Sequence, residues 1–124
     1  LPGGTRGVEN MKNSGKCVAL IRACFDAGKL IAAICAAPTL LSSMGLLKGR
    51  RAVVYPGLED ALEQGGARVQ YDEQITQDEN ILTARAAGSS VDFALRLINV
   101  LRGWYAAEKV RRAIYYVGND RSLT

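Results

Sequence analysis

Cys35 lies in the stretch of the chain whose residue types are best suited to chemistry. Residues 30–34, which precede it, are short and apolar, as is typical of a buried parallel strand. Pro38 follows closely and suits the first turn of a helix, where its missing N–H costs nothing. We therefore expect Cys35 between a strand end and a helix start, where the positive end of the helix dipole favours thiolate over thiol.

Small side chains flank Cys35 in the pattern of a nucleophile elbow. Ala33 and Ala37 occupy the two positions at which the motif G-x-S-x-G requires small residues, so that strand and helix can cross closely. The alternative interpretation is a structural cysteine buried in an alanine- and leucine-rich core, which is a common environment for this residue. This stretch by itself leaves both interpretations open.

The composition narrows the chemistry that Cys35 can perform. The chain has three cysteines and no histidine, and the absence of C-x-x-C spacing argues against a disulfide framework or a zinc site. Cys17 and Cys24 lie two turns apart on a predicted helix, about 10 Å along its axis, so we expect them to pack in the core as separate thiols. Without histidine no Cys-His dyad forms, so peptidase activity is not expected. We predict no metal and a cytoplasmic protein with reduced thiols.

The size and charge of the chain indicate one ordinary domain. Its 124 residues, 48% of them hydrophobic, are enough for a single core, and we assign residues 1–124 to one domain. The net charge is +4, but the basic residues are dispersed, so we predict no nucleic-acid partner. The longest apolar run is shorter than the roughly 20 residues that span a membrane and contains Pro38, so no membrane partner is expected.

Periodicity and turn residues predict alternating helices and strands. We expect a short helical turn at 8–12, helices at 15–27, 38–44, 58–64, 89–102 and 104–116, strands at 30–34, 52–55, 69–71 and 81–84, and a hairpin within 72–80. This alternation implies an α/β layered fold with a mostly parallel sheet. Active sites in such sheets lie beyond the carboxyl ends of the strands. Cys35, Gly4, Tyr55 and Arg85 all fall at predicted strand ends.

Two of these helices carry more specific expectations. Ser14 is expected to cap the first long helix, whose face toward the sheet comprises Cys17, Leu20, Ile21 and Cys24. Ser89 and Asp92 have the spacing of a capping box. The buried face of the helix that they would begin comprises Val91, Ala94, Leu95, Ile98 and Leu101.

Three motifs with matching spacing make essentially the whole chain resemble the ThiJ/PfpI superfamily. They are Leu1-Pro2-Gly3-Gly4, Ala32-Ala33-Ile34-Cys35-Ala36-Ala37-Pro38 and Leu82-Thr83-Ala84-Arg85-Ala86-Ala87-Gly88. The resemblance implies a flavodoxin-like three-layer α/β sandwich, usually a homodimer, with a mostly parallel sheet whose N-terminal strands would precede this chain. It also implies that the elbow cysteine, Cys35, is the nucleophile.

The resemblance further implies how the site is built. The backbone N–H groups of Gly4 and Ala36 would stabilise an oxyanion, and Gly3, Arg85 and Gly88 would line the substrate pocket. The family places a glutamate, from the turn after its first strand, beside the cysteine. This chain has no match for that segment, so an N-terminal segment of the same protein is expected to supply the glutamate.

The chain departs from the family pattern at two places. Tyr55 stands where many members carry a histidine, and it is expected either to donate a hydrogen bond to a substrate oxygen or to pack for bulk. Ala86-Ala87-Gly88 stands where relatives often have Gly-Pro-Gly, which is expected to alter the shape of the pocket.

The leading functional prediction is a cysteine-dependent enzyme of glyoxalase or deglycase type that needs no cofactor and acts on small carbonyls such as methylglyoxal. The alternative is a redox-sensing or chaperone-like stress protein in which Cys35 is oxidised to a sulfinate. A role in thiazole-phosphate biosynthesis has no support, because no phosphate-cradling glycine-rich loop precedes a helix.

Overall fold

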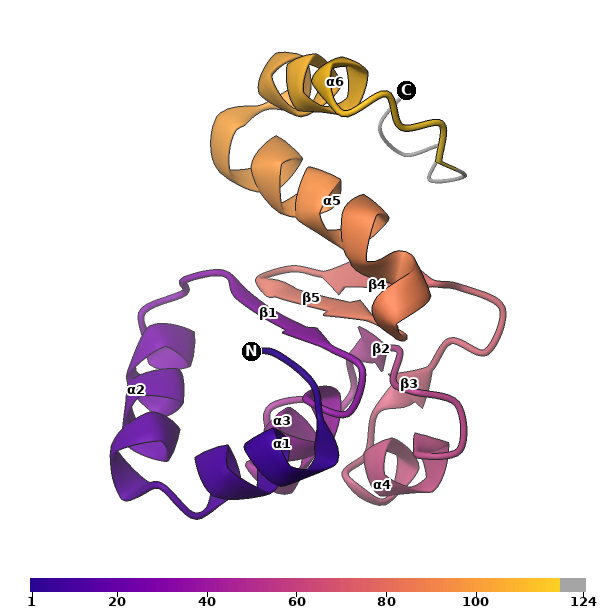
Figure 1. The fold of residues 1–124 in the computed structure, drawn as a ribbon. Helices are drawn as coiled ribbons and strands as arrows, with labels where there is room; N and C mark the ends of the chain where they lie inside the picture. Colours follow the sequence, from indigo (N-terminus) through magenta and orange to yellow (C-terminus); the bar gives the residue numbers. More distant parts are fainter. Residues whose placement is uncertain (119–124) are drawn as a thin grey trace.

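The computed structural model describes residues 1–118, which form helices on both sides of a small sheet (Figure 1). The helices are α1 (Thr5–Lys12), α2 (Gly15–Asp26), α3 (Pro38–Ser43), α4 (Glu59–Gln64), the 3-10 helix η1 (Ala87–Ser89), α5 (Ser90–Arg102) and α6 (Trp104–Ala113). The strands are β1 (Ile31–Ile34), β2 (Arg51–Ala52), β3 (Arg68–Val69), β4 (Ile75–Asp78) and β5 (Ile81–Ala84). The predicted alternation of helices and strands is confirmed.

The register of the central sheet places the functional strand ends side by side. β1 pairs in parallel with β5, with Ile31 opposite Ile81 and Ile34 opposite Ala84, and β4 completes the order β1-β5-β4 as an antiparallel neighbour of β5. β2 and β3 form a separate parallel pair. Because β1 and β5 end at the same level, the residues that follow them, Cys35 and Arg85, lie at one edge of the sheet.

The main core lies between this sheet and helices α1 to α4. All four residues of β5 are buried, as expected for a strand with neighbours on both sides, and Ile81 packs with the leucines of the helical layer. The largest completely buried side chains of this core are Leu40, Leu41, Leu47, Leu62 and Ile81. In Figure 1, α2, α3 and α4 lie below the sheet, and α5 and α6 lie above it.

Helix α2 follows most of its predicted pattern. The Ser14 side chain accepts a hydrogen bond of 3.2 Å from the Cys17 N–H, which confirms the predicted cap. Ile21 is buried, and Cys17 and Cys24 pack against the main core, but Leu20 is 65% exposed. The prediction for Leu20 is wrong because the face that meets the core is narrower than the apolar stripe.

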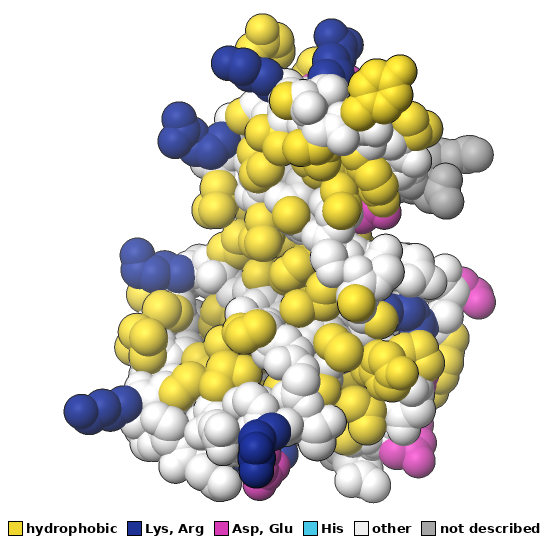
Figure 2. Space-filling view, viewed as in Figure 1, with side chains coloured by type: hydrophobic (Ala, Val, Ile, Leu, Met, Phe, Trp, Pro, Cys, Tyr) yellow, Lys and Arg dark blue, Asp and Glu magenta, His cyan; other side chains and the backbone are white. Residues whose placement is uncertain are grey.

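Helix α5 departs further from the sequence prediction. Only Leu95 is buried on its predicted face; Ile98 is partly buried, while Val91, Ala94 and Leu101 are exposed. The physical reason is that α5 packs mainly on α6, where Leu95 meets Ala107, and no other described element covers the rest of the face. Figure 2 shows the resulting hydrophobic surface between the two helices at the top and the body below.

The predicted capping box at the start of α5 is also wrong. Ser89 makes no side-chain cap and instead donates a 3.1 Å hydrogen bond to Gln74 Oε1. The alternative partner lies 15 residues away in the sequence, so the local spacing of Ser89 and Asp92 carries no information about it.

Four element boundaries differ from the prediction. The strand predicted at 52–55 ends at Ala52, since Val53 N–H donates to Thr83 Oγ1 at 3.0 Å and Tyr55 N–H turns to the Cys35 carbonyl. The strand predicted at 69–71 is β3, which ends at Val69. The hairpin expected within 72–80 is formed by β4 and β5 around Glu79, whose φ is +52°. The short turn expected at 8–12 is a full helix that begins at Thr5.

The cap at Ser14 gives a stability prediction. Ser14→Ala leaves an N–H in the first turn of α2 without its acceptor and is expected to lower the free energy of unfolding by about 1 kcal/mol. Urea denaturation followed by circular dichroism measures this change. Lys16→Ala, an exposed change in the same turn, is the control and is expected to stay within about 0.5 kcal/mol of the parent. Equal effects of the two changes would contradict the cap.

Candidate active site

Cys35 adopts a backbone conformation that side-chain-bearing residues rarely take. It follows β1 directly and has a φ of +65°, in the left-handed region that costs energy for residues other than glycine. Two hydrogen bonds of 2.9 Å hold it there, from Cys35 N–H to the Ala84 carbonyl and from Tyr55 N–H to the Cys35 carbonyl. Pro38 then occupies the first turn of α3, as the sequence predicts. Cys35 therefore lies at a strained turn between β1 and α3, and the use of this turn as a nucleophile elbow remains a prediction.

The Gly3-Gly4 segment passes close to Cys35. A Cβ atom built on Gly3 would lie 2.6 Å from Cys35 Cβ, a separation that real side chains do not tolerate. Gly4 has a φ of +92°, which favours glycine, and its carbonyl accepts the first hydrogen bond of α1 from Val8. Leu1 fixes the path of this segment, since its nitrogen donates to the Ala32 carbonyl at 2.7 Å, and its carbonyl accepts from Ile34 N–H at 3.2 Å.

A hollow of about 240 Å³ opens above Cys35 and brings several predicted residues together. Its lining consists of Gly3, Gly4, Ile34, Cys35, Ala87 and Ser90. Sequence reasoning missed Ile34 and Ser90 as lining residues, whereas Ala87 belongs to the loop that was expected to alter the shape of the pocket. The signal for Ser90 was the parallel pairing of β1 with β5, because the chain that leaves β5 must pass beside Cys35.

Two backbone N–H groups near Cys35 remain available. Neither Gly4 N–H nor Ala36 N–H donates a hydrogen bond to another residue within 1–118. Gly4 lines the hollow, whereas Ala36 follows Cys35 without lining it. Free N–H donors of this kind stabilise negative charge on a substrate oxygen. Their use in an oxyanion hole remains a prediction.

Arg85 is buried and fully engaged with neighbouring backbone. Its Nε donates to the Glu73 carbonyl at 2.6 Å and its Nη2 to the Gln70 carbonyl at 2.7 Å. Its Nη1 lies 3.7 Å from Glu59 Oε1, at the start of α4. The guanidinium thus ties the segment after β3 to α4, and Arg85 is not among the residues that line the hollow.

Tyr55 and Gly88 lie near the site without lining the hollow. Tyr55 N–H donates to the Cys35 carbonyl, and Tyr55 is 48% exposed, so the expected alternative of packing for bulk does not describe it. Gly88 lies within η1, between the two lining residues Ala87 and Ser90. A substrate contact by either residue remains a prediction.

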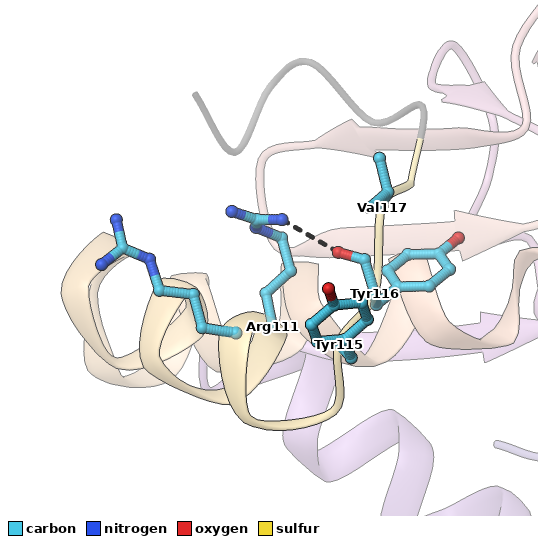
Figure 3. A pocket seen from close by; sticks show the side chains of 5 residues that line it. Arg111, Tyr115, Tyr116 and Val117 are labelled. Atoms are coloured by element: carbon cyan, nitrogen blue, oxygen red, sulfur yellow. Dashed lines mark hydrogen bonds between the residues drawn. The ribbon is translucent and has the colours of Figure 1, made fainter.

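A second hollow, of about 310 Å³, lies at the end of α6 and lacks a nucleophile. Arg111, Arg112, Tyr115, Tyr116 and Val117 line it, and Arg111 Nη1 donates to the Tyr116 carbonyl at 2.9 Å (Figure 3). Hydrogen bonds from Arg111 and Arg112 lower the pKa of Glu108 to about 2. Arg111 and Arg112 are thus held by Glu108 and by the Tyr116 carbonyl.

The structure offers few sites for other kinds of chemistry. Within residues 1–118, no three Cys, Asp or Glu side chains gather closely enough to bind a metal ion. Cys17, Cys24 and Cys35 are all free thiols. None of the helices in the described range is long and apolar enough to cross a membrane.

Together, the parallel β1-β5 pair and the cysteine elbow define a flavodoxin-like α/β protein, as the resemblance implied. The family model described as the DJ-1/PfpI family matches residues 1–100. The chain belongs to this family, which confirms the resemblance drawn from its motifs.

Similar proteins support the assignment. The chain is 36% identical over 116 residues to protein DJ-1alpha of Drosophila melanogaster, covering 94% of the chain and 53% of that protein. It is 32% identical over 102 residues to a protein of Pyrococcus abyssi named as a deglycase, covering 82% of the chain and 60% of that protein. The crystal structure of Drosophila DJ-1beta superposes with a TM-score of 0.89 at 31% identity, covering 94% of this chain and 62% of that one. The chain therefore spans little more than half the length of these relatives.

The close approach of Gly3 to Cys35 gives the prediction for this site. Gly3→Ala is expected to displace Cys35, lowering the free energy of unfolding by about 1–3 kcal/mol and changing the rate at which iodoacetamide modifies the Cys35 thiol. Thermal unfolding and peptide mass spectrometry measure the two effects. The control is Gly7→Ala, since a Cβ on Gly7 meets no atom within 4 Å. If Gly3→Ala behaved like Gly7→Ala, the proposed close packing would be wrong.

Proposed function

We propose that the protein is a cofactor-free, glyoxalase- or deglycase-like enzyme that acts on small reactive carbonyls such as methylglyoxal, with Cys35 as its nucleophile. The observation that carries this proposal is the left-handed backbone of Cys35 beside a hollow and a free Gly4 N–H. Strain of this kind is concentrated at functional sites. The relatives named as deglycases, at 31% and 32% identity, support the same class of reaction.

The first step of the proposed reaction joins the sulfur to the aldehyde carbon. The Cys35 thiolate attacks that carbon, a C–S bond forms, and the electron pair of the C=O bond moves onto oxygen. The N–H groups of Gly4 and Ala36 donate hydrogen bonds to this oxygen as its charge develops. The Tyr55 hydroxyl is proposed to donate to a second substrate oxygen, and Gly3, Arg85 and Gly88 to shape the surrounding pocket.

The later steps move a proton and release the acid. A base removes the proton from the attacked carbon and returns it to the neighbouring carbon, so one carbon is oxidised while the other is reduced and no external oxidant is needed. Water then breaks the C–S bond, releasing lactate from methylglyoxal or glycolate from glyoxal. No carboxylate of the described chain lines the hollow. We propose that a glutamate from an N-terminal segment of the same protein is this base, in a cytoplasmic homodimer.

A redox-sensing role is the second candidate. Cys35 is partly exposed in the hollow, and no second cysteine lines the hollow within the described residues, so an oxidised Cys35 has no nearby thiol to form a disulfide. Such a thiol can proceed to sulfinate. The structure of Toxoplasma gondii DJ-1, 33% identical, is of an oxidized form. Mild peroxide followed by intact-mass measurement tests this role, which requires a two-oxygen adduct that Cys35→Ser abolishes.

The enzyme proposal predicts the effect of removing the thiol. In the full-length protein, Cys35→Ser is expected to lower the rate of lactate formation from methylglyoxal at least about 1,000-fold, because the hydroxyl is a far weaker nucleophile at neutral pH. A coupled assay for lactate measures the rate. Cys17→Ser, a change in α2, is the matched control and should retain the parent rate. Retention of activity in Cys35→Ser would rule out the mechanism.

A further inference from the structure

Ser90 is the one lining residue of the hollow, besides Cys35, that has a polar side chain among the residues described. It is the first residue of α5 and is exposed. Its neighbour Ser89 is buried and bonded to Gln74, and the Arg85 guanidinium is bonded to backbone carbonyls. Ser90 is therefore the side chain in this part of the chain that can recognise a polar group of a substrate.

The hydrogen bond that Ser90 already makes determines what it can recognise. Its hydroxyl donates its proton to the Ala87 carbonyl, within η1. A serine hydroxyl has one proton and two acceptor lone pairs, so the remaining capacity of Ser90 Oγ is to accept. The N–H of Gly4, which also lines the hollow, is a donor without a partner among the described residues. The hollow thus offers a donor for one substrate oxygen and an acceptor for a hydroxyl group.

We propose that Ser90 Oγ accepts a hydrogen bond from a hydroxyl group on the carbon next to the one that Cys35 attacks. The preferred ligands are then small groups that bear a hydroxyl on this carbon, such as the 2-hydroxyacyl group that the proposed reaction forms on the Cys35 sulfur, rather than groups of the same size without a hydroxyl. Their small size follows from the hollow of about 240 Å³. The inference rests on the proposed function, because it takes the Cys35 sulfur as the reacting atom.

Two alkylating agents of nearly equal shape test this role without requiring turnover. In 2-iodoethanol the carbon next to the attacked one bears a hydroxyl group, and in 1-iodopropane it bears a methyl group. In both reactions the Cys35 sulfur forms a bond to carbon and iodide leaves. Peptide mass spectrometry of the full-length protein gives the rate at Cys35 alone, separately from Cys17 and Cys24.

Ser90→Ala is expected to slow alkylation of Cys35 by 2-iodoethanol about fivefold, the factor that corresponds to one net hydrogen bond of about 1 kcal/mol. The rate with 1-iodopropane should stay unchanged, which also shows that the surroundings of Cys35 remain intact. Ser90→Thr keeps the hydroxyl, so Cys35 in this variant should react with 2-iodoethanol at the parent rate. Ser43→Ala is the matched control, because Ser43 Oγ also donates to the carbonyl three residues earlier, at 2.7 Å, but on α3.

The outcomes separate this inference from the enzyme proposal. Equal slowing with both reagents, or no slowing with either, would show that Ser90 only supports the start of α5 and would overturn the inference. If Ser90→Ala slows the alkylation of Cys35 by 2-iodoethanol and leaves the rate with 1-iodopropane unchanged, the inference about Ser90 is supported, even if the protein fails to convert methylglyoxal. Turnover that depends on Cys35 but shows no Ser90 selectivity would contradict the role of Ser90 alone.

Discussion

The structure of the site depends on the pair of backbone hydrogen bonds that hold Cys35 at a φ of +65°. One bond ties Cys35 to Ala84 at the end of β5, and the other ties it to Tyr55 beyond β2. Both partners are distant in the sequence, so the strained residue is stable only when the sheet around it is assembled. Ala33 and Ala37 on either side are completely buried, which explains why larger residues would not fit at this crossing.

The features that the sequence predicted well are those that local chemistry determines. Small residues before a proline indicated the elbow, and Ser14 indicated a cap, because each acts on backbone atoms a few residues away. The parallel arrangement also followed from the alternation of short apolar strands with helices. For the cap of α2 and for the start of α3 at Pro38, the residues that produce the structure are neighbours in the chain, so their spacing carries the information.

The features that the sequence did not predict depend on distant partners. Arg85 was placed correctly at a strand end, but its side chain donates to the carbonyls of residues 70, 71 and 73, a set of contacts that spacing does not reveal. Ser89 likewise prefers Gln74 to its local capping partner. The apolar stripe of α5 predicted that the helix packs against something, but the stripe does not specify which element covers it. Leu101 therefore remains 65% exposed in the described chain.

In the proposed mechanism, backbone N–H groups rather than a histidine side chain stabilise the charge that develops at Cys35, since the sequence given contains no histidine. Gly3 lets the first segment approach the cysteine, and Gly4, with its φ of +92°, turns that segment into α1. α1 therefore begins beside the hollow, and the Gly4 N–H at its start is the donor proposed to stabilise negative charge there. Backbone groups held by glycine geometry are insensitive to most side-chain changes nearby. This explains how the loop that carries Ala86 and Ala87 can differ from the pattern of the family while the elbow and its donors stay in place.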